Sequence, residues 1–268
     1  MGNKIERDKQ ILELLKNHSQ KEVGEMFGLT QGRIAAICKK NGVRHKKSRL
    51  NMSKLKIDVS YFEEVNTPKK AYWLGFICAD GGINKTGGKL SICTKDLEIL
   101  EKLKTDISCG HKISKTENYD RRTNKIYEEY SIQVTNEIFV SNIIKHGVNQ
   151  KKTDVLNFPD WLDEDLYSYF IAGLFDGDGS VSYNTKKTAL RCSLISTKEV
   201  LEFINEFFLR KFGWVPCKIC KVTENKDNVY KGFWYKHAVD FLDYIYSGDK
   251  TVYLTRKYKI YDDYKQRK

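Results

Sequence analysis

Two short segments of this chain repeat each other. Residues 73–81 read Trp-Leu-Gly-Phe-Ile-Cys-Ala-Asp-Gly, and residues 171–179 read Ile-Ala-Gly-Leu-Phe-Asp-Gly-Asp-Gly. Each is an apolar run with small residues four apart, and each ends in Asp-Gly. The acids Asp80 and Asp178 are 98 positions apart, which is the length of a small domain. The repeat predicts a molecule of two related halves, each supplying one carboxylate to a shared site.

The composition indicates a polyanionic partner. The 268 residues suffice for a sizeable core, and their net charge of +12 favours nucleic acid. Residues 1–50 hold twelve Lys and Arg against five Asp and Glu, a net charge of +7. The polar N-terminus and the lack of a long apolar run argue against a membrane partner. Seven scattered cysteines are typical of reduced thiols, so we expect a cytoplasmic or otherwise reducing, DNA-containing compartment.

The basic N-terminal segment has the pattern of a helix-turn-helix. Apolar periodicity predicts helices over 8–17, 20–27 and 31–41, with a Gly-containing turn between the last two. This pattern resembles the small helix-turn-helix modules of resolvases and transcription regulators. A three-helix bundle with a merely solvated basic face is the alternative. We predict such a module over 1–47 and a linker over 48–66. Its candidate DNA contacts, all on the third helix, are Gln31, Arg33, Lys39 and Lys40.

The rest of the chain repeats one order of elements. In 67–150 and again in 151–268, a motif helix precedes a strand pair, an amphipathic helix, a long hairpin and another helix. Each half therefore reads αββαββα. We predict an α+β fold of two pseudo-symmetric halves, each an antiparallel sheet with helices on one face.

The small residues of the motifs predict how the two halves meet. Residues four apart share one face of a helix, and small ones allow two backbones to approach closely. Asp80 and Asp178 would then lie side by side at two helix C-termini, where the helix dipoles and mutual repulsion disfavour acids. Divalent cations between them would explain this placement. Gly81 and Gly179 are expected to adopt the left-handed conformation that ends many helices.

The two motifs closely resemble those of the single-chain LAGLIDADG homing endonucleases. In that family the penultimate acid of each motif is the metal-binding catalytic residue, which corresponds to Asp80 and Asp178 here. Residues 147–153, Gly-Val-Asn-Gln-Lys-Lys-Thr, resemble a further family segment, and so do residues 253–257, Tyr-Leu-Thr-Arg-Lys. The resemblance implies one active-site lysine per half, Lys152 and Lys257. We assign no metal-binding role to the backbone of Ala79, the residue before Asp80. Asp176, two residues before Asp178, is expected to have a structural role.

The resemblance implies a divalent-metal-dependent endonuclease that cuts double-stranded DNA as a monomer. Mg²⁺, or another cation such as Mn²⁺, would be held by the two acids. The sheets would form a saddle over a long, non-palindromic target. The remaining candidate DNA contacts are strand residues that alternation places on the outward face and residues at the tip of the first hairpin. They are Arg121, Arg122, Ser131, Gln133, Arg191 and Ser193.

Other functions remain open on the same scaffold. A DNA-binding regulator that does not cleave is the main alternative, and an RNA maturase is the second. An intein is disfavoured, because the chain has no Cys or Ser at position 1 and does not end in His-Asn. Cys217 and Cys220 have the spacing of two zinc ligands, but no second pair accompanies them. The Asp-Gly-Asp-Gly turn lacks the Gly and Glu that a calcium loop requires at its sixth and twelfth positions.

Overall fold

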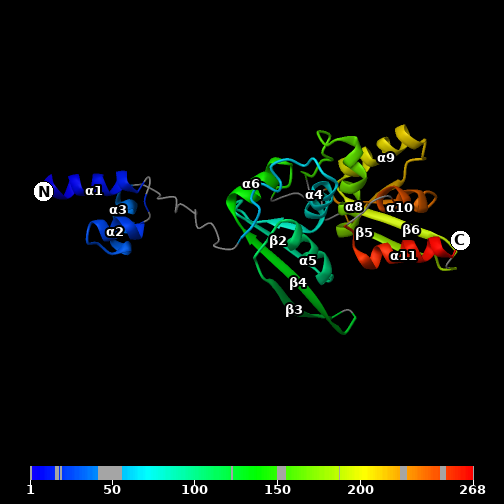
Figure 1. The fold of residues 1–268 in the computed structure, drawn as a ribbon, viewed down its shortest axis with the longest axis horizontal. Coiled ribbons are helices and arrows are strands. Elements are labelled where there is room, and N and C mark those ends of the chain that lie inside the picture. Colours follow the sequence, from blue (N-terminus) through cyan, green and yellow to red (C-terminus); the bar gives the residue numbers. More distant parts are fainter. Residues whose placement is uncertain are drawn as a thin grey trace. The chain divides into compact units, whose positions relative to one another are not determined.

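The computed structural model describes residues 2–15, 18, 20–41, 56–121, 123–149, 155–186, 188–223, 228–247 and 252–267. The chain divides into two compact units, residues 1–52 and 53–268, and each has its own hydrophobic core. Figure 1 shows the elements of both units. No helix among the described residues is long and apolar enough to cross a membrane.

The first unit is a bundle of three helices around a small apolar core that includes Ile11, Val23 and Ile34. Its first helix begins earlier than predicted. Thr30 caps the third helix by accepting a hydrogen bond from the Arg33 N–H, and Gly28 takes a left-handed φ of 62° in the preceding turn. The helices are α1 (Gly2–Leu14), α2 (Gln20–Met26) and α3 (Gln31–Lys40).

The second unit contains both predicted halves, and the predicted α+β fold is confirmed. Each half holds a four-stranded antiparallel sheet, in the orders β1-β2-β4-β3 and β5-β6-β8-β7. The first half comprises α4 (Pro68–Asp80), β1 (Gly81–Ile83), β2 (Lys89–Thr94), α5 (Leu97–Asp106), β3 (Ile113–Asp120), β4 (Lys125–Thr135) and α6 (Glu137–Lys145). The second comprises η1 (Glu164–Leu166), α8 (Tyr167–Asp178), β5 (Gly179–Tyr183), β6 (Leu190–Ser196), α9 (Lys198–Phe212), β7 (Lys218–Lys221), β8 (Tyr230–Trp234), α10 (Ala238–Tyr246) and α11 (Thr255–Gln266).

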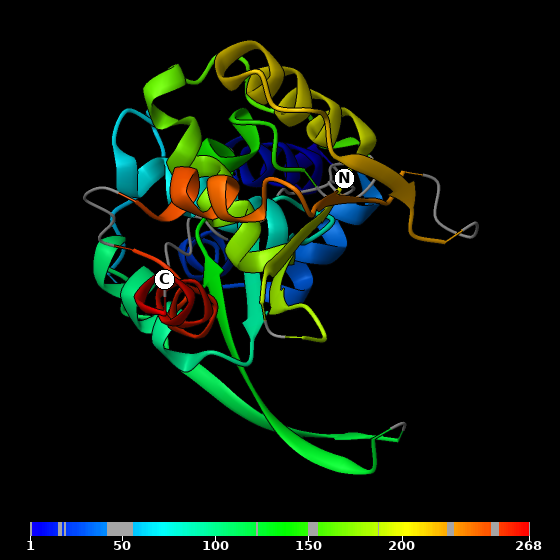
Figure 2. The ribbon, with the colours of Figure 1, turned by 90° about the vertical axis from the view of Figure 1, so that its right-hand side faces the viewer.

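Helices cover one face of each sheet and leave the other face open. The covered face holds alternate strand residues, such as Ile132 and Val134 of β4 and Cys192 and Leu194 of β6, all at most 1% exposed. Figure 2 shows the β3–β4 hairpin extending well beyond the rest of its sheet. Residues 56–66, predicted to belong to a linker, instead pack on this unit, where the Phe62 side chain is fully buried.

The helices α4 and α8 pack against each other through glycines, as the motifs predict. A Cβ on Gly75 would lie 2.1 Å from the carbonyl oxygen of Phe170, and a Cβ on Gly173 would lie 2.0 Å from that of Tyr72. Real Cβ atoms do not approach so closely, so the two backbones touch only because these positions lack side chains. The contact is reciprocal, which gives the unit its pseudo-two-fold seam.

The expected left-handed ends of the motif helices are wrong. Gly81 has φ −74° and ψ 137°, and Gly179 has φ −85° and ψ 164°, both extended. The chain passes directly from each helix into a strand, so no left-handed residue is needed. Glycine is required there for space, because a Cβ would lie 2.6 Å from the Ile77 oxygen in one half and 2.4 Å from the Phe175 oxygen in the other.

Candidate active site

The last residues of α4 and α8 are the two motif acids, and the helix seam brings them together. A Cβ on Gly177 would lie 2.3 Å from the Cβ of Ala79 and 3.4 Å from the carboxyl carbon of Asp80. The Asp80 carboxyl group therefore sits against the residue that precedes Asp178. Asp80 is half-buried and Asp178 is exposed. The structure thus places the Asp80 carboxyl group next to the backbone that carries Asp178.

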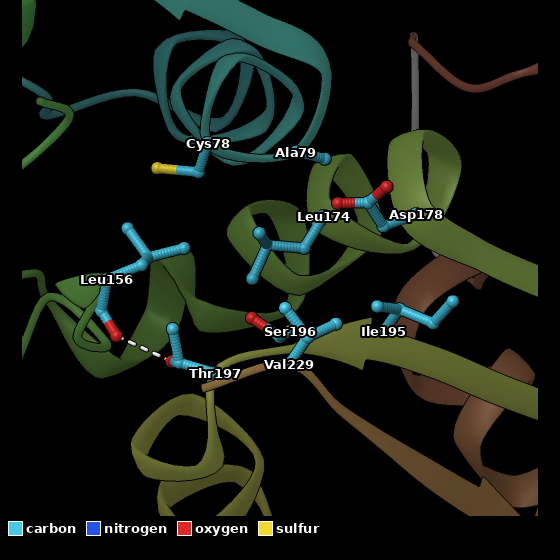
Figure 3. Close-up of a pocket in the computed structure, with 9 residues that line it drawn as sticks. All are labelled: Cys78, Ala79, Leu156, Leu174, Asp178, Ile195, Ser196, Thr197 and Val229. Atoms are coloured by element: carbon cyan, nitrogen blue, oxygen red, sulfur yellow. Dashed lines mark hydrogen bonds between the residues drawn. The ribbon is translucent and has the colours of Figure 1, made fainter. Parts of the chain in front are cut away.

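A small cavity of about 50 Å³ adjoins Asp178 on the side of the second half. Figure 3 shows Asp178 at one end of it, Ala79 above and the aliphatic side chain of Leu174 at its centre. The hydrogen bond from the Thr197 hydroxyl to the Leu156 carbonyl, 2.6 Å long, closes the other end. The remaining lining is mostly apolar and includes Leu156, Ile195 and Val229.

Lys257 lies beneath the end of α8. Its side chain is 2% exposed, and Nζ donates hydrogen bonds to the carbonyl oxygens of Phe175 at 2.7 Å and Asp176 at 2.8 Å, with Gly177 at 3.5 Å. The last carbonyls of a helix have no partners within the helix and carry partial negative charge, which an ammonium group satisfies. Burial lowers the pKa of Lys257 to about 8, while the carboxylates of Asp176, Asp80 and Asp178 oppose this shift.

The resemblance implies that Lys257 acts on the phosphate or orients water; here its ammonium group is buried and bonded to three carbonyls at the end of the helix. The other predicted lysine, Lys152, lies outside the described residues. The structure therefore places one lysine behind one acid, where it fixes the end of the helix that carries Asp178.

Asp176 is a buried anchor, as expected for that position. Its carboxylate accepts hydrogen bonds from the hydroxyls of Tyr72 and Tyr246, at 2.7 and 2.5 Å, and from the Leu254 N–H at 2.7 Å. Burial raises the pKa of Asp176, although these three bonds favour the ionised form. The partners come from α4, α10 and the start of α11, so one side chain ties together both halves.

Every residue of the segment 253–257 makes a specific contact, and the segment joins the two halves. The first half receives three of these contacts: Lys102 donates to the Tyr253 carbonyl, Thr255 donates to Glu98, and the Arg256 Nε donates to both oxygens of Asp96 at 2.9 and 3.0 Å. Leu254 and Lys257 contact the second half as described above. We call residues 253–257 the clasp. It holds α5 of the first half against the end of α8.

The open faces of the sheets carry four of the ten predicted DNA contacts. Gln133 and Arg191 are exposed there, and Ser131 is partly exposed. Ser193 differs from the prediction, because it is 8% exposed and stands in the ladder between Ser180 and Phe233. Directly opposed residues of neighbouring strands have Cβ atoms about 5 Å apart. Larger neighbours on the same face therefore limit what Ser193 can contact.

The other predicted contacts lie on helix α3 and the first hairpin tip. Arg121 is exposed at that tip, and Arg122 lies outside the described residues. The α3 side chains Gln31, Arg33, Lys39 and Lys40 are all exposed.

Sequence reasoning missed the aromatic residues of the second open face. Phe233 and Tyr235 alternate with core residues in and just after β8, and their rings stack at 5.6 Å. The pattern Lys231-x-Phe233-x-Tyr235 has the period of a strand face, which is the signal that could have revealed them.

The acids fit a divalent cation of the hard, oxygen-binding kind. Mg²⁺ is usually held by one or two carboxylates, with waters and substrate phosphates completing the shell. Asp80 and Asp178 supply such a pair, whereas Lys257 already occupies the nearest α8 carbonyls. Within the described ranges no cluster of three or more His, Cys, Asp or Glu side chains is suited to a metal. All seven cysteines are free thiols.

Comparison with known proteins identifies the fold. Residues 165–259 match the family model of the LAGLIDADG-like domain. Most of the second half of the chain is therefore similar to a LAGLIDADG-like domain. The homing endonuclease I-WcaI, solved bound to its DNA recognition sequence, is similar in structure, with a TM-score of 0.54 over 75% of this chain and 90% of that one. The sequence identity is 16%, so this likeness shows the LAGLIDADG fold alone.

Two other proteins are also similar to parts of this chain. Full-length DUF199/WhiA from Thermatoga maritima matches with a TM-score of 0.46 and 16% identity, over 79% of this chain and 66% of that one. The replication factor C small subunit of Methanocaldococcus jannaschii is 29% identical over 168 residues, which are 60% of this chain. The chain spans only 8% of the length of that relative.

Proposed function

We propose that this protein is a site-specific endonuclease of double-stranded DNA that hydrolyses phosphodiesters with the help of divalent metal. The observation that carries the proposal is the meeting of Asp80 and Asp178 at the ends of two helices packed through glycines. A glycine seam that brings two acids together has no evident structural benefit, because acids are disfavoured at helix C-termini.

The surroundings of the acids support nucleic acid as the substrate. The open faces of both sheets lie in the same unit as the acids, and the chain has a net charge of +12. Exposed Gln133 and Arg191 are side-chain types that read base edges in the major groove. The LAGLIDADG-like domain and the DNA-bound endonuclease of similar fold point in the same direction. A target contacted by two different sheets would be long and not palindromic.

In this proposal Asp80 and Asp178 hold the metal. A divalent cation there would polarise the phosphate and lower the pKa of an attacking water. The helix seam holds Asp80 in place. The clasp holds Asp178 in place, because its buried residue Lys257 bonds to the last carbonyls of α8. Lys257 thus acts as a positioning residue, and Lys152 remains the proposed counterpart in the first half.

The remaining features of the proposal concern assembly and the first unit. Both acids belong to one chain, so a monomer completes the site without a second copy. Residues 1–47, linked to the catalytic unit, would extend the recognised DNA through α3, on which Gln31 and Arg33 are exposed in the first turn. The free thiols suit a reducing, DNA-containing compartment.

Cleavage of a randomised duplex library tests the function. The protein is incubated with the library and Mg²⁺, and the new ends are sequenced. We expect ends that align on one long sequence, with none formed when Mg²⁺ is chelated. The control variant Asp160→Asn changes an exposed acid away from the site and should cut as the wild type does. Selective retention of duplexes without any cutting would overturn the nuclease and favour a regulator.

A further inference from the structure

The open faces of the two sheets differ in chemistry. In the first sheet the ladder places the outward side chains of β2 and β4 in register, with Lys89, Ser91 and Cys93 opposite Thr135, Gln133 and Ser131. These are mainly hydroxyl and amide groups, which read bases through hydrogen bonds. In the second sheet the corresponding positions of β8 carry Lys231 and Phe233, opposite Ile195 and Ser193 of β6.

The second face carries a row of two neighbouring rings with a cation at each end. Lys231 Nζ lies 5.3 Å from the centre of the Phe233 ring, and the Phe233 and Tyr235 rings stack at 5.6 Å with 23° between their planes. The Arg191 guanidinium lies 5.9 Å from the centre of the Tyr235 ring. We call these four residues the aromatic row. The first sheet differs: among its described residues, the one aromatic ring that faces outward with a cation over it is Tyr127, which lies under Lys95.

The packing of the row determines what its rings can touch. Lys231 and Tyr235 flank Phe233 along the strand, and Phe233 and Arg191 neighbour Tyr235. Cations and the neighbouring ring therefore lie against the faces of both rings. A nucleobase that stacks needs a free ring face, as in proteins that bind single strands. The uncovered part of the Phe233 ring offers an apolar surface with no hydrogen-bonding group, and Tyr235 adds a hydroxyl to a similar surface.

The charges and the exposure of the row and its neighbours suit contact with a DNA duplex. Tyr235 is 58% exposed, and a hollow of about 310 Å³ lies beside it and Arg191. The outward positions of the second sheet at β6, β7 and β8 include Arg191, Lys218 and Lys231 but no acid. On a bound duplex, cations of this kind would contact phosphates, and the rings between them would face the groove. The apolar group that the major groove offers is the C5-methyl of thymine.

We propose that the aromatic row reads thymine methyl groups, so that the two halves of the target are recognised by different chemistry. The inference rests on the proposed DNA-binding function and assigns its specificity. The half-site under the first sheet is read through hydrogen bonds by residues such as Gln133. The half-site under the second sheet is read through apolar contacts of Phe233 and Tyr235, and it contains thymines at the contacted positions.

Replacing thymine by deoxyuracil tests this without altering the protein. The bound sequence is first selected from a randomised duplex library in Ca²⁺, and thymines are then replaced by deoxyuracil in one half-site at a time. Losing a buried methyl group should weaken binding by roughly fourfold for each contacted thymine. We expect the dissociation constant to rise in one half-site and to change little in the other.

Variants assign the effect to the row. Phe233→Ser and Tyr235→Ser should bind the thymine and uracil forms of the half-site under the second sheet equally. Phe233→Leu keeps an apolar side chain and should therefore retain part of the difference between the two dissociation constants. Tyr119→Ser removes an exposed ring from the opposite face of the first sheet and should leave the difference unchanged. Thermal melting verifies that each variant is folded.

The outcomes separate the inference from the function on which it rests. Selective duplex binding with no thymine preference in either half-site, or a preference that survives both serine variants, would overturn the aromatic row as a methyl reader. Equal affinity for single-stranded oligonucleotides would also overturn it and favour stacking on the rings. Failure to bind any duplex would refute the proposed function itself, and the inference with it.

Discussion

The Nζ of Lys257 lies 2.7 Å from the carbonyl oxygen of Phe175, three residues before Asp178. The clasp that carries Lys257 also contacts α5 of the first half through Thr255 and Arg256. A single segment therefore fixes the end of α8 and holds the two halves together. In this account Lys257 acts on the reaction by keeping Asp178 in place.

Lys257→Met should lower the cleavage rate by roughly tenfold or more, which is the usual scale when a group that orients a metal ligand is lost. The free energy of unfolding should fall by about 1–3 kcal/mol, because buried helix carbonyls lose their donor. The dissociation constant for target DNA should stay within several-fold. Single-turnover cleavage and gel-shift titration measure the two effects. A loss confined to binding would show that Lys257 contacts DNA after all.

The stability contributed by Lys257 should depend on pH. Burial lowers its pKa to about 8 in the folded chain, against 10.5 for an ordinary lysine. Between these values the unfolded chain holds a proton that the folded chain has lost, so the free energy of unfolding should increase with pH there. Below about pH 8 lysine is charged in both states and adds no pH dependence.

Denaturant titrations of the wild type and of Lys257→Met, run from pH 7 to 10.5, isolate this effect. The wild type should gain stability relative to the variant above about pH 8. A difference between the two proteins that stays constant or shrinks over that range would show that the ammonium is not desolvated in the folded chain.

Gly173→Ala should loosen the seam between the halves. The added Cβ would lie 2.0 Å from the Tyr72 carbonyl and 2.7 Å from the Phe76 nitrogen, both backbone atoms that cannot turn aside. Overpacking of this kind costs about 1–3 kcal/mol and displaces Asp178 from Asp80. Gly82→Ala is the matched control, since its Cβ would meet its nearest neighbour at 3.8 Å. Equal melting temperatures for the two variants would refute the close contact.

A chain beginning at residue 53 should keep the fold and the cleavage chemistry. The two units have separate cores, and Asp80, Asp178 and Lys257 all lie in the second. The truncated chain should bind DNA more weakly, protect a shorter footprint, and show a flatter dependence of affinity on salt, because fewer phosphates are neutralised. An unchanged footprint and salt slope would mean that residues 1–52 do not contact the DNA.

Local patterns predicted most of the fold and the two acids. Strand and helix periods gave the αββαββα order, and the repeated small residues gave the glycine seam. The sequence singled out residues 253–257 but not their role in joining the halves, because their partners in the first half, such as Asp96 for Arg256, are more than 150 positions away. The extended conformation of Gly81 and Gly179 and the low exposure of Ser193 depend on strand register, which alternation alone does not fix.

The most direct test compares Asp80→Asn and Asp178→Asn on the selected target. Each change keeps the size of the side chain and removes one metal-binding carboxylate. Each variant should lower double-strand cleavage by roughly 100-fold or more, since such groups supply several kcal/mol of transition-state stabilisation. Both variants should bind the target with dissociation constants close to that of the wild type. If either one cuts both strands at the wild-type rate while Mg²⁺ is required, the assignment of the two acids as the shared active site is wrong.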